Sequence, residues 1–201
     1  PLYGARWQQR GGRIVVDGVG TGFGGRSLLL TTGDTPQPPY ELAVAVKLAD
    51  ESGAAGLVFH SDGGHKHYGF YPSNGRLRLS RFEGSDVFSW QVLAEKAASS
   101  YRPGQWNRLK VRVERDKLQC FVNDELVIET SDRVFQEGRV GLAKFRNTGA
   151  EFRLFRTAKE IAPDRLDEAS IARLRQSIER LPPLSEAGEE VLRALALSDS
   201  R

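Results

Sequence analysis

Residues 54–71 read AAGLVFHSDGGHKHYGFY and predict the β-hairpin around which the fold is built. The pair Gly63-Gly64 separates two runs of aromatic and branched residues. Such a pair favours a tight hairpin turn, because the central positions of that turn need positive φ. With the two glycines as the loop, Phe59 lies opposite Tyr68. The sequence therefore predicts two antiparallel strands in a defined register.

The two faces of this hairpin differ in character, because side chains alternate across a strand. The first face is apolar and is expected in the core; it carries Leu57, Phe59, Tyr68 and Phe70. The second face is mixed; it carries Val58, His60, Asp62, His65, His67 and Tyr71. The chain contains 3 histidines, so the sequence predicts that all of them share the second face, with His60 opposite His67.

Other segments of the first 158 residues also predict short strands. Residues 40–48 alternate cleanly: every second residue is large and apolar, and the small residues between them suggest a face that another segment approaches. Comparable runs occur at Ser27–Thr32, Arg76–Phe82, Phe88–Leu93, Leu109–Glu114, Lys117–Val122, Leu126–Glu129, Gly138–Phe145 and Glu151–Arg156. About a dozen strands at spacings of roughly 8–12 residues indicate an antiparallel sandwich or barrel.

Composition excludes several classes of protein. The chain has 201 residues, of which 39% are hydrophobic and 27% charged, a balance typical of globular domains. No apolar run approaches the ~20 residues of a membrane-spanning helix. The net charge of +3 is spread without a basic block, which argues against a nucleic-acid partner. Cys120 is the only cysteine, so no intrachain disulfide can form.

The chain contains no methionine and begins without a signal peptide. We therefore expect it to be a processed or excised piece of a longer protein. These features do not decide its cellular compartment, and the absence of a disulfide is compatible with the cytoplasm.

The C-terminal part changes character at Ala162-Pro163, so the expected domains are residues 1–158 and residues 159–201. Asp164 is a candidate N-cap for a first amphipathic helix that ends at Pro182-Pro183. Ser185 is a candidate N-cap for a second. Two short helices cannot bury their apolar stripes alone, so residues 164–197 are expected to pack on the sandwich, on another chain or on a further domain. We favour a connector to a following domain.

Several segments, taken in order, resemble the concanavalin A-like lectin/glucanase superfamily in its laminin-G-like branch. The resemblance covers roughly residues 7–156 and rests on short stretches: Ala55–Phe59, Tyr68–Phe70, Pro103–Leu109, Phe121–Leu126, Gly138–Leu142 and Phe152–Leu154. The most similar family is the 3-keto-disaccharide hydrolase domain, formerly a domain of unknown function. The resemblance implies an all-β, antiparallel two-sheet jelly-roll sandwich, here with a short C-terminal helical segment. It also implies a concave sheet face for glycans and suggests a secreted or cell-envelope location.

The chain departs from that hydrolase family at the hairpin. Ala54-Ala55-Gly56 stands where the family has Asn-Ser-Gly, and His60 stands where it has arginine. The family's following strand carries a Gly-Tyr-Glu stretch, whereas residues 67–71 contain no acid. The resemblance therefore carries no catalytic acid over to this chain.

A metal site is one hypothesis for the mixed face of the hairpin. Opposed side chains on paired strands lie about 5 Å apart at Cβ. Imidazole and carboxylate groups suit zinc and other transition metals. The candidate ligands for a divalent ion such as zinc, manganese or calcium are His60, His67, Asp62 and His65.

A glycan site is the second hypothesis. Aromatic rings pack on the C–H faces of sugars, while imidazole, carboxylate and guanidinium groups hydrogen-bond to hydroxyls. We expect His60 and His67 as central contacts, Asp62 and His65 at the rim, and Tyr71 as a stacking platform. Neighbouring strands add Arg76, Arg78 and Trp90.

Catalysis is the third hypothesis, and a glycosidase of the usual kind needs two suitably spaced carboxyl groups. The candidate acids are Glu41, Glu83, Asp86, Glu114 and Glu151, and no motif pairs them.

The sequence therefore favours a non-catalytic module of a larger protein that binds a carbohydrate or glycoconjugate. The first alternative is a hydrolase or lyase that acts on 3-keto glycosides, with or without the assistance of a metal. The second is a structural domain that assembles through its C-terminal helices.

Overall fold

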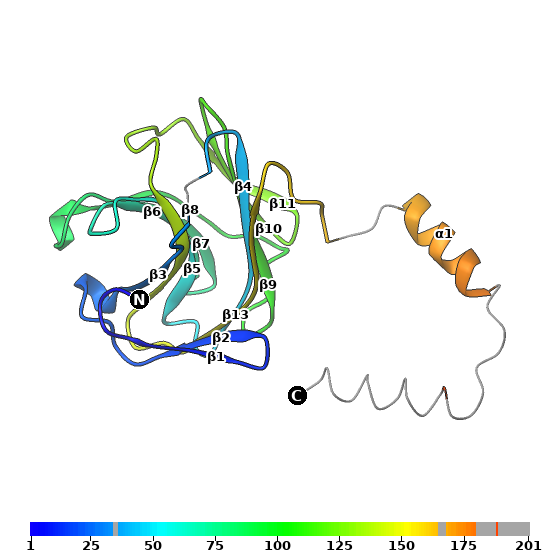
Figure 1. Cartoon of the computed structure of the whole chain (residues 1–201), viewed down its shortest axis with the longest axis horizontal. Coiled ribbons are helices and arrows are strands. Elements are labelled where there is room, and N and C mark those ends of the chain that lie inside the picture. Colours follow the sequence, from blue (N-terminus) through cyan, green and yellow to red (C-terminus); the bar gives the residue numbers. More distant parts are fainter. Residues whose placement is uncertain (34–35, 165–167, 180–187, 189–201) are drawn as a thin grey trace. The chain divides into compact units, whose positions relative to one another are not determined.

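The computed structural model describes residues 1–33, 36–164, 168–179 and 188. The chain divides into two compact units, Pro1–Asp164 and Arg165–Arg201. The first unit consists of two antiparallel sheets, as Figure 1 shows. The predicted fold class, an antiparallel β-sandwich of the concanavalin A-like type with a short C-terminal helical segment, is therefore confirmed.

Strands distant in the sequence pair within each sheet. The seven-stranded sheet has the order β1 (Arg6–Arg10), β2 (Arg13–Asp17), β13 (Ala150–Ala158), β4 (Tyr40–Leu48), β9 (Asn107–Val113), β10 (Leu118–Val122) and β11 (Glu125–Thr130). The six-stranded sheet has the order β3 (Ser27–Leu30), β12 (Arg139–Phe145), β5 (Ala54–Ser61), β6 (His67–Ser73), β7 (Arg76–Phe82) and β8 (Trp90–Lys96). Two 3₁₀-helices, η1 (Phe23–Gly25) and η2 (Val87–Ser89), lie in the connecting loops.

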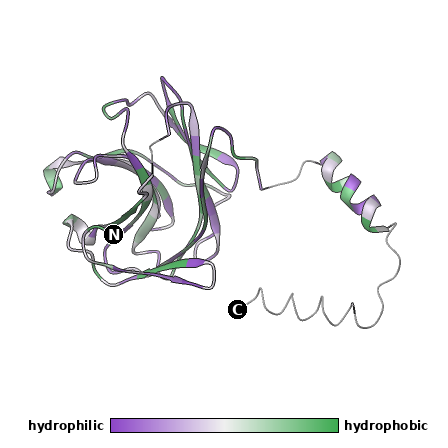
Figure 2. Cartoon of the chain, viewed as in Figure 1, coloured by the Kyte–Doolittle hydropathy of each residue, from purple (hydrophilic) through white to green (hydrophobic). Residues whose placement is uncertain are grey.

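The main core lies between the two sheets. The predicted apolar face of the hairpin is buried there, against the large apolar residues of β4 and β9. Figure 2 shows hydrophobic and hydrophilic residues interleaved along the strands, as expected when one side of each strand faces a core. Each fully buried Leu, Phe or Val contributes roughly 1.5–3 kcal/mol of hydrophobic free energy relative to an exposed side chain.

A second apolar cluster lies on the opposite face of the six-stranded sheet. It contains Leu28, Ala54, Val58, Tyr71, Phe82, Ala143 and Phe145, and Leu2, Tyr3, Leu30 and Trp90 pack against it. In Figure 1 this sheet curves around the N-terminal end of the chain, and η1 and η2 stand on the open side of the curve. The concave face is therefore covered in part by its own N-terminal segment.

The outer face of β4 is covered by the segment that follows β13. The amide of Ile161 donates a hydrogen bond to Glu41 Oε2 (2.6 Å), and Ile161 is 4% exposed. Arg108 donates to the carbonyl of Ala162 (2.7 Å) and pairs with Asp164 (2.9 Å). The small residues on this face of β4 do face an approaching segment, and the sandwich unit extends to Asp164.

The second unit contains the helix α1 (Glu168–Glu179). The apolar residues Ile171, Leu174 and Ile178 of this helix are exposed. Apart from residue 188, which is helical, the predicted second helix lies outside the described residues, and the connector role stays a prediction. Within the described ranges no helix combines the length and hydropathy needed to cross a membrane.

The close approach of β5 and β6 leaves no room for a side chain at Gly56, and this can be tested. A Cβ at this position would lie 2.3 Å from the carbonyl oxygen of Phe70. Gly56→Ala is therefore expected to lower the free energy of unfolding by about 1–3 kcal/mol or more, measured by urea denaturation. Gly33→Ala is the control, because a Cβ there meets no atom of the described residues within 4 Å. Equal stability of the two variants would contradict this packing.

Candidate functional site

The central hairpin contains a bulge that its sequence did not reveal. The pairs Leu57–Phe70 and Phe59–Tyr68 form as predicted. Beyond them His60 adopts φ 49°, and the amide of Asp62 donates to the carbonyl of Lys66 (3.1 Å). The first strand thus holds one extra residue, which is the definition of a bulge. The side chains beyond Phe59 are re-aimed as a result.

His60 points toward the end of the core rather than toward the concave face. Its ring lies among those of Tyr40, Phe59 and Tyr68, with centroids 6.2, 5.6 and 6.0 Å away. Nδ1 donates to the carbonyl of Phe135 (2.9 Å), so the neutral ring keeps its lone pair on Nε2. Burial lowers the pKa of His60 to about 4. His60 is 3% exposed, and among the described residues Nε2 has no hydrogen-bond partner.

His67 and His65 lie on the concave side and share one buried arginine. Arg26, which is 1% exposed, donates to His67 Nε2 (3.1 Å) and contacts His65 Nδ1 (3.1 Å). Its guanidinium also lies against the rings of Tyr3 (5.2 Å) and Phe82 (5.3 Å). Complete burial, reinforced by the charge of Arg26, lowers the pKa of His67 to about 3.

The prediction that all three histidines share one face is therefore wrong, and the bulge at His60 is the physical reason. His60 and His67 lie on opposite sides of the sheet, and both ring nitrogens of His67 are already hydrogen-bonded. The four residues proposed as metal ligands, His60, Asp62, His65 and His67, are not brought together. Within the described part of the chain, no group of three or more His, Cys, Asp or Glu side chains could hold a metal ion.

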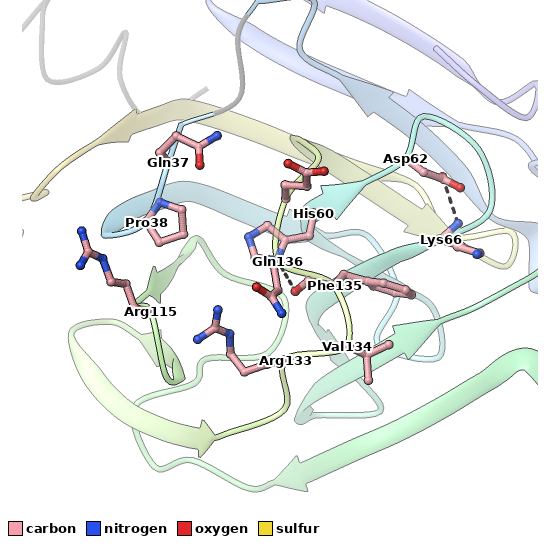
Figure 3. A pocket seen from close by; sticks show the side chains of 11 residues that line it. Gln37, Pro38, His60, Asp62, Lys66, Arg115, Arg133, Val134, Phe135 and Gln136 are labelled. Carbon is pink, nitrogen blue, oxygen red and sulfur yellow. Dashed lines mark hydrogen bonds between the residues drawn. The ribbon is translucent and has the colours of Figure 1, made fainter.

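The first candidate site is an open cleft at one end of the sandwich, which we call the end cleft (Figure 3). It has a volume of about 810 Å³ and lies among the loops that follow β3, β5, β9 and β11. Its lining residues are Gln37, Pro38, His60, Asp62, Lys66, Arg115, Arg133, Val134, Phe135, Gln136 and Glu137. Polar and charged groups dominate this lining.

The second candidate site is a smaller pocket on the concave face, which we call the aromatic pocket. It has a volume of about 70 Å³ and is lined by Phe23, Gly24, Ala54, Tyr71, Ser73, Arg78, Phe82, Trp90, Phe145 and Arg146. Trp90 stacks on Phe82 (5.5 Å) and meets Phe23 edge-on (6.2 Å). Arg78 is held by a hydrogen bond from Nε to Glu95 (2.7 Å), and the buried Ser73 Oγ has no hydrogen-bond partner in the part of the chain that the structure describes.

The predicted glycan contacts are distributed over four places. Tyr71, Arg78 and Trp90 come together in the aromatic pocket. His60 and Asp62 line the end cleft. His65 and His67 bind Arg26, and Arg76 at the start of β7 pairs with Glu95 (2.8 Å) on β8.

Tyr71 does not offer the exposed stacking surface that was expected. It is 1% exposed, packs on Phe145 (4.8 Å) and shares a hydrogen bond with Ser80 (2.8 Å). The aromatic rings available to a ligand are those of Phe23 and Trp90. Tyr71 instead forms the floor of the pocket.

Sequence reasoning missed the residues that loops contribute. Phe23 belongs to the glycine-rich η1 turn, and Arg26 follows it directly. Arg115 and Arg133 lie between strands, in β9–β10 and β11–β12 connections. No periodic signal marks such positions, because only the closure of the sandwich brings them together.

The five candidate acids line neither site. Glu41 is buried under Ile161, and Asp86 caps η2. The other three each pair with an arginine: Glu83 with Arg81, Glu114 with Arg112 and Glu151 with Arg13. Each of these carboxylates therefore has a structural role.

Comparison with known proteins places the chain in a family. Residues 3–157 match the 3-keto-disaccharide hydrolase family, described as the 3-keto-alpha-glucoside-1,2-lyase-like domain. The match covers more than half of the chain, so the chain belongs to this family, as its sequence predicted.

The individual proteins that resemble this chain share less than a third of its residues over the aligned regions. The levanase of Bacillus subtilis (strain 168) is 29% identical over 122 residues, which are 59% of this chain and 17% of the levanase. The carbohydrate-binding module CBM66 from Bacillus subtilis has a similar structure, with a TM-score of 0.64, 22% identity and coverage of 77% of this chain and 91% of that one. A Bacillus subtilis protein of unknown function with a galectin-like fold has a TM-score of 0.61 at 12% identity, covering 79% and 87% of the two chains.

The buried histidines predict a stability that depends on pH. The pKa values of His60 and His67, about 4 and about 3, lie below the ordinary value of 6.5. Between pH 6.5 and 4.5 the unfolded chain therefore binds more protons than the folded one, and the free energy of unfolding falls as the pH falls. The slope is at most about 1.4 kcal/mol per pH unit for each histidine.

Urea denaturation across this pH range measures that slope. His67→Gln is expected to reduce it, because glutamine does not titrate. His65→Gln is the matched control, since His65 is exposed. A wild-type stability that stays constant from pH 6.5 to pH 4.5 would contradict the burial of both imidazoles.

Proposed function

We propose that this domain is a carbohydrate-binding module of a larger protein, with the aromatic pocket as its glycan site. The observation that carries the proposal is the convergence of Tyr71, Arg78 and Trp90 with Phe23 on one pocket of the concave sheet. Aromatic walls with a few polar groups are typical of small-ligand sites.

The chemistry of the pocket suits part of a sugar. Trp90 and Phe23 offer ring surfaces for C–H groups. A guanidinium has five N–H donors, so Arg78 retains donors for hydroxyls beyond those that Glu95 accepts. Ser73 Oγ adds a group that can both donate and accept. The volume of about 70 Å³ admits one edge of a sugar ring, which favours a terminal residue of a glycan.

Exposed apolar side chains beside the pocket extend this surface. On η2, Phe88 is 97% exposed and Val87 is 52% exposed. Phe23 on η1 is 37% exposed. Figure 1 shows both 3₁₀-helices on the open side of the concave sheet, where the remainder of a glycan would lie.

The comparisons support a carbohydrate ligand. The names of two similar proteins, a carbohydrate-binding module and a levanase, refer to carbohydrates. This chain spans only 17% of the levanase, so hydrolysis by that whole enzyme does not transfer to it. Assembly through the exposed stripe of α1 stays a separate prediction.

Glycan binding is tested by calorimetric titration with levan oligosaccharides and α-glucosides, after a glycan array has ranked them. Trp90→Ala is expected to weaken binding roughly tenfold or more, a loss of about 1.4 kcal/mol or greater. Trp106→Ala is the matched control, because Trp106 packs against Arg13 and Arg153 and lines neither site. Identical affinities for the two variants would refute the assignment of the pocket.

Lyase or hydrolase activity on 3-keto glycosides is the second candidate, favoured by the family to which the chain belongs. His60 offers a lone pair on Nε2 at the end cleft, but its pKa of about 4 makes it a weak base at neutral pH. We expect no turnover of a 3-keto-α-glucoside, with or without added divalent metal, in a chromatographic assay. Turnover that disappears in His60→Asn would overturn the non-catalytic assignment.

A further inference from the structure

The end cleft holds an unusual group of positive charges. Lys66, Arg115 and Arg133 all line it, and within the described residues none of the three forms an ion pair. Most of the other arginines on the sandwich contact a carboxylate. Asp62 and Glu137 line the same cleft, so its three cations outnumber its carboxylates by one, and this excess of positive charge favours an anionic ligand. A guanidinium group can bind a carboxylate through two parallel hydrogen bonds, which adds geometric specificity to the attraction between the charges.

The buried imidazole of His60 adds a second, independent requirement. Its Nδ1 donates to the carbonyl of Phe135, so Nε2 is an acceptor, and no described residue pairs with it. A buried acceptor left unpaired costs roughly 1–3 kcal/mol. A simple carboxylate cannot satisfy it, because an ionised carboxylate only accepts hydrogen bonds. A ligand that pairs with Nε2 must therefore also carry a donor, such as a hydroxyl.

The remaining lining of the cleft agrees with a hydroxylated ligand. Asp62 and Glu137 are acceptors, and the side chains of Gln37 and Gln136 can both donate and accept. Asp62 Oδ1 already accepts from the amides of Gly64 (2.7 Å) and Lys66 (3.1 Å), which fixes its position. Figure 3 shows Arg133 near Gln136 and the ring of His60, with Arg115 farther out on the side of Pro38.

We propose that the end cleft binds a sugar acid, in which a carboxylate faces Arg115, Arg133 and Lys66 and a hydroxyl donates to His60 Nε2. The cleft volume of about 810 Å³ accommodates at least one sugar acid of this kind. This site is separate from the aromatic pocket and does not depend on the glycan site proposed there. A cyclic uronate and an acyclic hydroxy acid share the required chemistry, and the experiment distinguishes them.

The test is an NMR titration of the full chain with methyl β-D-glucuronide, gluconate, methyl β-D-glucoside and cyclohexanecarboxylate. We expect at least one of the two hydroxylated acids to bind, with a Kd of about 1 mM. The neutral glucoside and the carboxylate without hydroxyls are expected to bind at least tenfold more weakly. Binding should also shift the ¹⁵N resonance of His60 Nε2.

Substitutions in and outside the end cleft test whether the sugar acid binds there. Arg115→Gln and Arg133→Gln should each weaken the binding of the sugar acid roughly tenfold, whereas Arg10→Gln, an exposed arginine on β1 outside the cleft, should not. Trp90→Ala should leave this binding unchanged, which separates the two proposed sites. Binding that is equal for glucuronide and glucoside, insensitive to both cleft arginines, or absent up to about 20 mM would overturn the proposal.

Discussion

The bulge at His60 is the constraint on which the arrangement of the sites depends. A non-glycine residue at φ 49° is disfavoured, so the surrounding structure must hold it. Here the hydrogen bond to Phe135 and the rings of Tyr40, Phe59 and Tyr68 hold the imidazole. The bulge separates the histidines of one hairpin between two surfaces that differ in chemistry.

Arg26 determines the shape of the concave face in a comparable way. A buried guanidinium needs compensating partners, and it finds them in the imidazoles of His65 and His67 and the rings of Tyr3 and Phe82. These contacts tie the N-terminal segment to the hairpin. The segment closes one side of the sheet and leaves the aromatic pocket beside it, between η1 and β8.

Sequence patterns predicted the sandwich well because alternation reports directly which side of a strand is buried. The core faces of β4 and of the hairpin follow from it, as does the pairing of Phe59 with Tyr68. The same reasoning failed one residue later, because the local sequence gives no sign that His60 adopts positive φ. Three contacts of the aromatic pocket were predicted, whereas the arginines of the end cleft lie in loops that only tertiary structure brings together.

The separation of the histidines by the bulge is tested most directly by determining the tautomer and charge of each imidazole. Long-range ¹⁵N–¹H NMR correlation at pH 6 measures both. The hydrogen bonds predict that His60 and His67 are both neutral and both protonated on Nδ1, since each Nδ1 faces a carbonyl. Adding zinc should leave both patterns unchanged. A charged ring, a proton on His60 Nε2, or coupled shifts of the two histidines on zinc addition would contradict the separation of the histidines by the bulge.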